Sequence, residues 1–328
     1  MSHLLRPLLF GWALVGLGLP HILLAAEPLT AGPVEPATEL VFTEGPAYSP
    51  DGSVFFTDIA NNRIMRLWPG AEAASVFLRP SGRANGLVFD TEGRLLVCEG
   101  NERGGLGGRR IARLDIVTQK RTVIVDRFDG KRFNSPNDLC LDKQGRIYFT
   151  DPYYGDDRGQ LELDVEGVYR VDADGKNLTR LLGADKIARP NGIAISGDQR
   201  TLFVVDNHPL KPVRKLWAFQ LTENGDVNGP GKQLHDFGAG RGGDGMAIDT
   251  LDNLYVTGGA DRPYVNQNTD NVGGVYVFSP QGKLLQVIDI PEDMVTNCCF
   301  GGADRKTLYV TAGKTLWKVP MKIPGRIR

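Results

Sequence analysis

Six side chains that offer an oxygen donor recur at fairly regular intervals along the chain. The first interval is 41 residues and the others are 52 to 54 residues, and the six are Glu44, Asn85, Asn137, Asn191, Asp244 and Asn297. We call them the head residues, because each begins a copy of one sequence pattern. Carboxylate and amide oxygens without His or Cys favour Ca²⁺, and less strongly Mg²⁺, over zinc or copper. Six converging oxygens are costly to bury without a partner, so convergence would predict a divalent cation whose charge Glu44 and Asp244 balance.

A second interpretation explains several head residues as parts of turns. Asn-Gly and Asp-Gly pairs are common turn signals, and four of the six copies begin with Asn or Asp followed by Gly or Asp. Turn formation does not require Glu44 or Asn297, however. The shared position of all six residues therefore favours a cation site.

The pattern that follows each head residue is a pair of strands. A short apolar segment, a turn rich in Asp and Gly, and a second segment of β-branched and aromatic residues come in that order, as in residues 137–151 (NDLCLDKQGRIYFTD). A third strand-like segment follows in every copy, and a fourth in most. Four short antiparallel strands in a repeat of this length form one blade of a propeller.

The repeats predict an all-β protein, a six-bladed β-propeller over residues 38–328. The first strand of each blade lines the channel of a propeller, so the head residues are expected to meet around its axis. The sixth copy lacks a fourth strand, and Thr38–Thr43 can supply one and close the ring. A stacked β-solenoid is the less favoured alternative, because its repeats are usually shorter and need capping units.

The N-terminal residues have the composition of a targeting segment. Residues 1–6 are weakly basic and residues 8–24 are apolar, which predicts a signal peptide over residues 1–26. A Pro-rich linker is expected at residues 27–37. The mature protein is therefore expected in the periplasm or outside the cell, without stable membrane insertion. An uncleaved membrane anchor is the alternative, and the glycines and prolines in the apolar run weaken it.

The net charge, the cysteine positions and the absence of certain motifs argue against several classes of function. The formal net charge of −1 indicates no basic patch for nucleic acid or an anionic membrane. No Gly-x-Ser-x-Gly motif is present, and His208 and His235 are the only histidines after residue 26, which leaves few candidates for a Ser-His-Asp triad. The cysteines lack the spacing of a zinc site and are expected to be buried free thiols: Cys98, Cys140, Cys298 and Cys299.

Several longer motifs resemble one known family, SMP-30/gluconolactonase/LRE, and most of all its bacterial gluconolactonases. These motifs are EGPAYSPDG, RFNSPNDLCLDKQGRIYFTDPYYG, RPNGIAIS and GGDGMAID. The resemblance implies a six-bladed β-propeller with one divalent metal in its channel, Ca²⁺ first, with Zn²⁺, Mn²⁺ and Mg²⁺ as alternatives. Carried over motif by motif, it implies four metal ligands: Glu44, Asn137, Asn191 and Asp244. The other two head residues, Asn85 and Asn297, would then line the substrate pocket.

The resemblance also implies an enzyme that hydrolyses a small-molecule sugar lactone. The cation would polarise the lactone carbonyl and stabilise the oxyanion, with Asp244 as general base for the attacking water. A metal-bound carboxylate is a weak base, so a metal-bound water is the competing assignment. Glu99 and Tyr153 are candidates for contacts to sugar hydroxyls at the channel mouth. For Glu99 we favour slightly the alternative, a strand end that is solvated or paired with arginine.

Two rival functions stay open on this reasoning. One is hydrolysis of another ester, such as an organophosphate or a non-sugar lactone, at the same metal site. The other is a propeller that binds a ligand or partner without turnover. Mutation of Asp244 separates these classes, because an enzyme would lose turnover while a binder would keep its ligand affinity.

Overall fold

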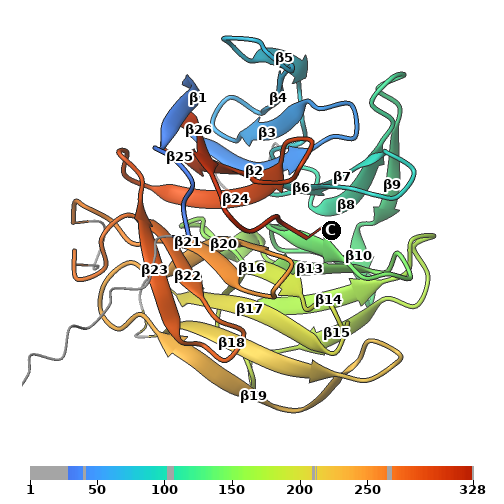
Figure 1. The fold of residues 1–328 in the computed structure, drawn as a ribbon. Coiled ribbons are helices and arrows are strands. Elements are labelled where there is room, and N and C mark those ends of the chain that lie inside the picture. Colours follow the sequence, from blue (N-terminus) through green and yellow to red (C-terminus); the bar gives the residue numbers. More distant parts are fainter. Residues whose placement is uncertain are drawn as a thin grey trace, which may run out of the picture.

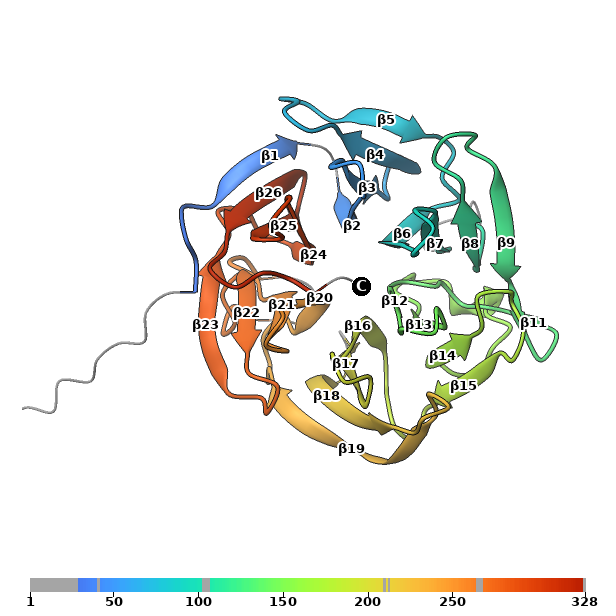
Figure 2. The same cartoon turned by 45° about the vertical axis from the view of Figure 1, so that its right-hand side comes forward.

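Six four-stranded antiparallel sheets and one two-stranded sheet make up the fold (Figure 1). The computed structural model describes residues 29–39, 42–101, 107–208, 211, 213–263 and 268–326. The six larger sheets surround a common axis (Figure 2), which confirms the predicted all-β, six-bladed β-propeller. The predicted signal peptide, residues 1–26, lies outside the described residues. Within them, no helix has the length and apolar character needed to cross a membrane.

Each blade is numbered here from the first complete sheet of the chain. Blade 1 contains β2 (Thr43–Tyr48), β3 (Val54–Asp58), β4 (Arg63–Leu67) and β5 (Ser75–Leu78). Blade 2 contains β6 (Ala84–Phe89), β7 (Leu95–Glu99), β8 (Arg110–Leu114) and β9 (Arg121–Val125). Blade 3 contains β12 (Leu139–Leu141), β13 (Ile147–Asp151), β14 (Gly167–Val171) and β15 (Thr179–Leu182).

The remaining blades follow the same order, with one exception at the end. Blade 4 contains β16 (Pro190–Ile195), β17 (Thr201–His208), β18 (Val213–Leu221) and β19 (Val227–Asp236). Blade 5 contains β20 (Gly243–Ile248), β21 (Leu254–Gly258), β22 (Gly274–Phe278) and β23 (Leu284–Asp289). Blade 6 contains β24 (Val295–Gly301), β25 (Thr307–Ala312), β26 (Thr315–Pro320) and β1 (Glu35–Glu39). Two short elements lie outside the blades. The connection from blade 2 to blade 3 contains a small hairpin, β10 (Arg127–Phe128) and β11 (Lys131–Arg132), and the connection from β13 to β14 contains a 3₁₀ helix, η1 (Arg158–Gln160).

The ring closes through β1, which pairs antiparallel with β26 at the rim of blade 6 (Figure 2). This confirms closure by an N-terminal strand, but the strand spans Glu35–Glu39 and not Thr38–Thr43. The reason is that Thr43 already begins β2, the innermost strand of blade 1, so the outermost strand of blade 6 must end earlier in the chain. Residues 35–37, expected to be part of the linker, therefore belong to the propeller.

The innermost strand of each blade faces the axis, and neighbouring inner strands contact one another all around the ring. These inner strands are β2, β6, β12, β16, β20 and β24. The C-terminal segment crosses toward the centre of the propeller (Figure 2), where Arg326 N donates to Ile248 O at 3.0 Å. Ile248 is the last residue of β20, whereas Asp244 lies at its beginning. The C-terminal segment thus lies at the opposite end of this inner strand from its head residue.

The hydrophobic core lies mainly between adjacent blades. Phe149 and Tyr169 of blade 3 pack in one cluster with Leu96 and Ile111 of blade 2. All four side chains are buried, and full burial of a large apolar side chain stabilises a fold by about 1.5–3 kcal/mol. The four cysteines are buried and remain thiols, as expected: Cys98, Cys140, Cys298 and Cys299.

Replacement of one central aromatic residue tests this packing. Phe149 stacks on Tyr169 with ring centroids 5.4 Å apart and meets Phe133 edge-on at 5.1 Å. We expect Phe149→Ala to lower the free energy of unfolding by about 3–5 kcal/mol, because it leaves a cavity between two blades. Urea unfolding followed by tryptophan fluorescence measures the loss. Val117→Ala, at an exposed position, should change it by less than about 0.5 kcal/mol, and an equal loss would contradict the packing.

Candidate functional site

The six head residues lie at one end of the six inner strands and are all buried. Five are in the first half of their strand, and Asn137 precedes β12 by two residues. Because neighbouring inner strands contact each other in a closed ring, the head residues encircle the channel. The structure therefore brings together all six residues that the repeats predicted.

The glycine that follows most head residues permits close approach between blades. A Cβ added to Gly45 would lie 2.0 Å from the backbone oxygen of Asn85, and one added to Gly192 would lie 2.4 Å from that of Asp244. Gly45 also has a φ of +48°, which only glycine adopts readily. The Gly at this position is thus explained by contact between inner strands, and a turn is not needed to explain it.

A break in strand pairing lies beside five of the six head residues. The register between the first two strands shifts next to Glu44, Asn85, Asn191, Asp244 and Asn297. Bulges of this kind redirect a side chain and leave backbone groups to be satisfied locally. Threonines of the second strand help to do this. Thr150 Oγ1 accepts from Asp138 N at 3.1 Å, and Thr257 Oγ1 lies 2.8 Å from Thr296 O and 3.0 Å from Gly245 O, to one of which it donates.

Two buried carboxylates at the ring carry charge that the protein balances incompletely. Burial, then repulsion from Asp244, raises the pKa of Glu44 well above its usual range, against hydrogen bonds from Gly45 N and the Asn297 side chain. Burial raises the pKa of Asp244 to about 6 despite the neighbouring Arg241 guanidinium. Arg241 Nη2 donates to Asp244 Oδ2 at 2.5 Å. Asp138 adds a third nearby negative charge that disfavours ionisation of both carboxylates.

Two amide oxygens at the ring have no hydrogen-bond partner in the described structure. They are Oδ1 of Asn85 and Oδ1 of Asn191, both shielded from solvent. Leaving such a group unsatisfied costs about 1–3 kcal/mol. A cation would remove this cost, and it would also favour the ionised forms of Glu44 and Asp244.

The donor set fits a hard cation and does not resemble a zinc site. Among the described residues, no three His, Cys, Asp or Glu side chains are grouped so as to hold a metal. The ring combines carboxylates with amide oxygens, and this oxygen-only set is typical of Ca²⁺ sites. Asn297 is the head residue least suited to be a ligand, because its Oδ1 accepts from Cys298 N at 2.8 Å and its side chain also hydrogen-bonds to Glu44.

The two candidates for sugar contacts are engaged elsewhere. The carboxylate of Glu99 is completely buried and pairs with Arg110 Nε at 2.7 Å and Arg121 Nε at 3.0 Å. It is therefore the arginine-paired strand end that we favoured, and its substrate role is not supported by its contacts. Tyr153 is buried, and its hydroxyl donates to Asp157 O at 2.9 Å within its own loop. The neighbouring Tyr154 contacts the ring instead, through a 2.9 Å bond from Asn191 Nδ2 to its hydroxyl.

Buried acidic residues at the ends of second strands were not recognised from the sequence as supports for the site. Asp151 accepts from Asn134 N and Ser135 N, each at 2.8 Å. Asp206 accepts from Ala188 N at 3.0 Å and from Arg189 N at 2.7 Å. Each carboxylate thus fixes the segment two or three residues before a head residue. The recurrent acidic residue at the end of this strand in the repeats was the available signal.

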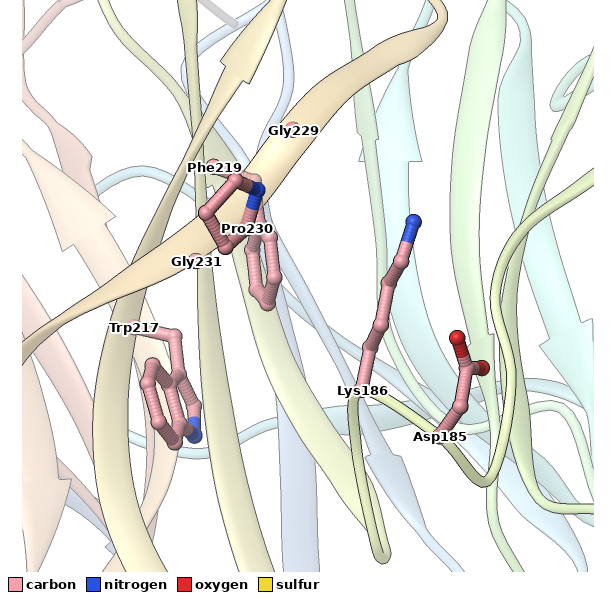
Figure 3. A pocket seen from close by; sticks show the side chains of 7 residues that line it. All are labelled: Asp185, Lys186, Trp217, Phe219, Gly229, Pro230 and Gly231. Atoms are coloured by element: carbon pink, nitrogen blue, oxygen red, sulfur yellow. The ribbon is translucent and has the colours of Figure 1, made fainter.

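A separate pocket of about 540 Å³ lies on the outside of blade 4 (Figure 3). Trp217 and Phe219 of β18 and Gly229–Gly231 of β19 form one side, and Asp185 and Lys186 form the other. β19 is the outermost strand of its sheet, so this pocket is at the rim of the propeller. It includes none of the head residues.

Known proteins share this sequence and fold. Residues 42–314 match the SMP-30/Gluconolactonase/LRE-like region. A gluconolactonase of Zymomonas mobilis is 34% identical over 314 residues, which cover 88% of this chain and 81% of the relative. The structure of a gluconolactonase from Xanthomonas campestris has 29% identity and a TM-score of 0.71, covering 86% of this chain and 87% of that chain. A calcium-binding regucalcin from Agrobacterium tumefaciens, 20% identical, shares the fold with a TM-score of 0.71 over 91% of this chain and 96% of that chain.

Mutation of Asp206 tests the support for Asn191. Asp206→Ala leaves one buried and one partly buried N–H group without an acceptor, which we expect to lower the free energy of unfolding by about 2–4 kcal/mol. Asp206→Asn keeps one acceptor oxygen, so its free energy of unfolding should fall by clearly less than that of Asp206→Ala. Urea unfolding of both variants measures the difference, and equal stability of Asp206→Ala and the unaltered protein would show that these hydrogen bonds do not fix the segment.

Proposed function

Because the chain belongs to the SMP-30/gluconolactonase/LRE-like family, we propose that it hydrolyses a sugar lactone. The reaction would use one divalent cation bound by head residues, with Ca²⁺ as the preferred candidate. Relatives named gluconolactonase and lactonase support an enzyme that hydrolyses lactones. The observation that carries the proposal is the convergence of buried carboxylates and an unpartnered amide oxygen around one channel.

Four head residues are the proposed cation ligands: Glu44, Asn137, Asn191 and Asp244. The carboxylates supply negative charge that burial otherwise disfavours, and Asn191 supplies an oxygen that lacks a partner. Asn85 is the better of the two remaining head residues for a substrate contact, since its Oδ1 also lacks a partner. Asn297 instead positions Glu44 through their hydrogen bond.

In the proposed reaction, the cation and the side chains have different roles. When bound, the cation supplies a Lewis acid that polarises the lactone carbonyl and stabilises the oxyanion. Asp244 is the proposed general base for the attacking water, because burial raises the pKa of its carboxyl and so offsets part of the lowering that a bound cation causes. Arg241 orients this carboxylate by donating to Oδ2.

We also propose that residues 1–26 direct export to the periplasm or the medium and are then removed. The basic start and the apolar run of this segment support the proposal. Cell fractionation followed by N-terminal sequencing of the mature protein tests it. A protein that keeps Met1 in the cytoplasmic fraction would contradict it.

Chelation tests the dependence on a cation. Protein dialysed against EDTA should lose hydrolysis of δ-gluconolactone and recover it when Ca²⁺ is restored. Mg²⁺, Mn²⁺ and Zn²⁺ added separately rank the other candidates. Full activity of the stripped protein, with metal content checked by mass spectrometry, would overturn the cation proposal.

Substitution of the proposed base separates the enzyme from its rivals. At saturating Ca²⁺, Asp244→Asn should lower kcat by about 10²- to 10⁴-fold, the usual contribution of a general base. Asp174→Asn, at an exposed position, is the control and should leave kcat unchanged. A panel of sugar lactones, non-sugar lactones and a phosphotriester identifies the substrate class. Lactone binding without turnover in the unaltered protein would indicate a binding propeller, and undiminished turnover by Asp244→Asn would exclude Asp244 as base.

A further inference from the structure

One tyrosine outside the ring contacts a proposed cation ligand directly. Tyr154 lies in the connection from β13 to β14 of blade 3, whereas Asn191 is in the inner strand of blade 4. Asn191 Nδ2 donates to the Tyr154 hydroxyl at 2.9 Å, and that hydroxyl donates to the backbone oxygen of Asn207 at 3.3 Å. The Tyr154 ring also stacks near the Arg189 guanidinium, 5.2 Å from its centroid. Tyr154 is therefore fixed at both its ring and its hydroxyl.

The number of protons on these groups determines which way the Asn191 amide faces. A tyrosine hydroxyl has one proton, and Tyr154 gives it to Asn207 O. Its oxygen can then only accept from Asn191, so the NH₂ end of the amide must face it. Asp244, an acceptor as well, takes a hydrogen bond from the same side chain. Both neighbours at this end of the amide thus require nitrogen there.

The opposite end of the amide is consequently the oxygen. Asn191 Oδ1 is buried and has no partner in the described structure. A flipped amide would present N–H groups in this place, and N–H groups cannot bind a cation. The orientation of this one amide therefore decides whether Asn191 can act as a ligand.

We propose that Tyr154 is a positioning residue for the cation site, which holds the Asn191 amide with its oxygen available to Ca²⁺. This inference rests on the proposed cation site. Tyr154 does not itself bind the metal. Its contribution is to make one of two amide orientations strongly preferred before the cation arrives.

Calorimetric titration of EDTA-stripped protein with Ca²⁺ tests the inference without an activity assay. Tyr154→Phe removes the hydroxyl and keeps the ring, and it should weaken Ca²⁺ binding by about 10- to 100-fold, as loss of a group that orients a metal ligand usually does. Tyr276→Phe is the matched control. Its hydroxyl donates to Val272 O at 2.7 Å in blade 5, so its removal should leave Ca²⁺ affinity unchanged.

A double-mutant cycle shows whether Tyr154 acts through Asn191. In an Asn191→Ala background, Tyr154→Phe should cause no further loss of Ca²⁺ affinity. A further loss as large as in the unaltered background would overturn the proposed route, and so would equal affinity of Tyr154→Phe and the unaltered protein. Thermal unfolding of the stripped variants confirms that they are folded. Failure of the unaltered protein to bind any divalent cation would instead refute the cation site itself.

Discussion

Equivalent polar groups from six repeats are forced onto one axis, and much of the structure serves to accommodate that constraint. Each inner strand contacts the next, and glycines such as Gly45 and Gly192 allow the backbones to approach more closely than any side chain would permit. The fold thereby concentrates buried oxygens where water is displaced. Burial raises the pKa of Glu44 and Asp244, and so does repulsion, from Asp244 and Asp138 on Glu44 and from Asp138 on Asp244. The apolar packing between blades thus maintains an electrostatically unfavourable cluster.

Functional sites are where local rules are expected to be violated, and the ring follows that expectation. Outside the ring, some buried polar groups have partners, as Asp151 has in two backbone N–H groups, and others, such as Asn134 Oδ1 and Trp217 Nε1, have none among the described residues. At the ring, Asn85 Oδ1 and Asn191 Oδ1 have none there either. What distinguishes the ring is that its unpartnered oxygens belong to the same ring of head residues as two buried carboxylates. A stable fold can keep such groups when the surrounding packing is strong. The unsatisfied oxygens therefore indicate capacity for a ligand that the chain alone does not supply.

The repeats predicted what is periodic in the structure, namely the blades, the ring closure and the six head residues. They could not predict contacts that arise once. Arginine pairing was the favoured expectation for Glu99, but only the structure shows that its partners are Arg110 of β8 and Arg121 of β9. Tyr153 and Tyr154 are indistinguishable in sequence, and only the path of their loop brings the second to Asn191. The bounds of β1 depended on where β2 begins, which local propensity does not fix.

The supports around the ring differ from one repeat to the next. Asp58, Asp151 and Asp206 accept backbone N–H groups two or three residues before Glu44, Asn137 and Asn191, respectively. In blade 5 the second strand ends in Gly258, and Arg241, three residues before Asp244, binds that carboxylate instead. Blade 2 has its acidic strand end paired with arginines, and blade 6 ends this strand in Ala312. Before Asn297, however, Asp293 accepts from Met294 N at 2.9 Å, three residues ahead of that head residue. A cation requires oxygens that are fixed in position, and the supports beside the four proposed ligands meet that requirement.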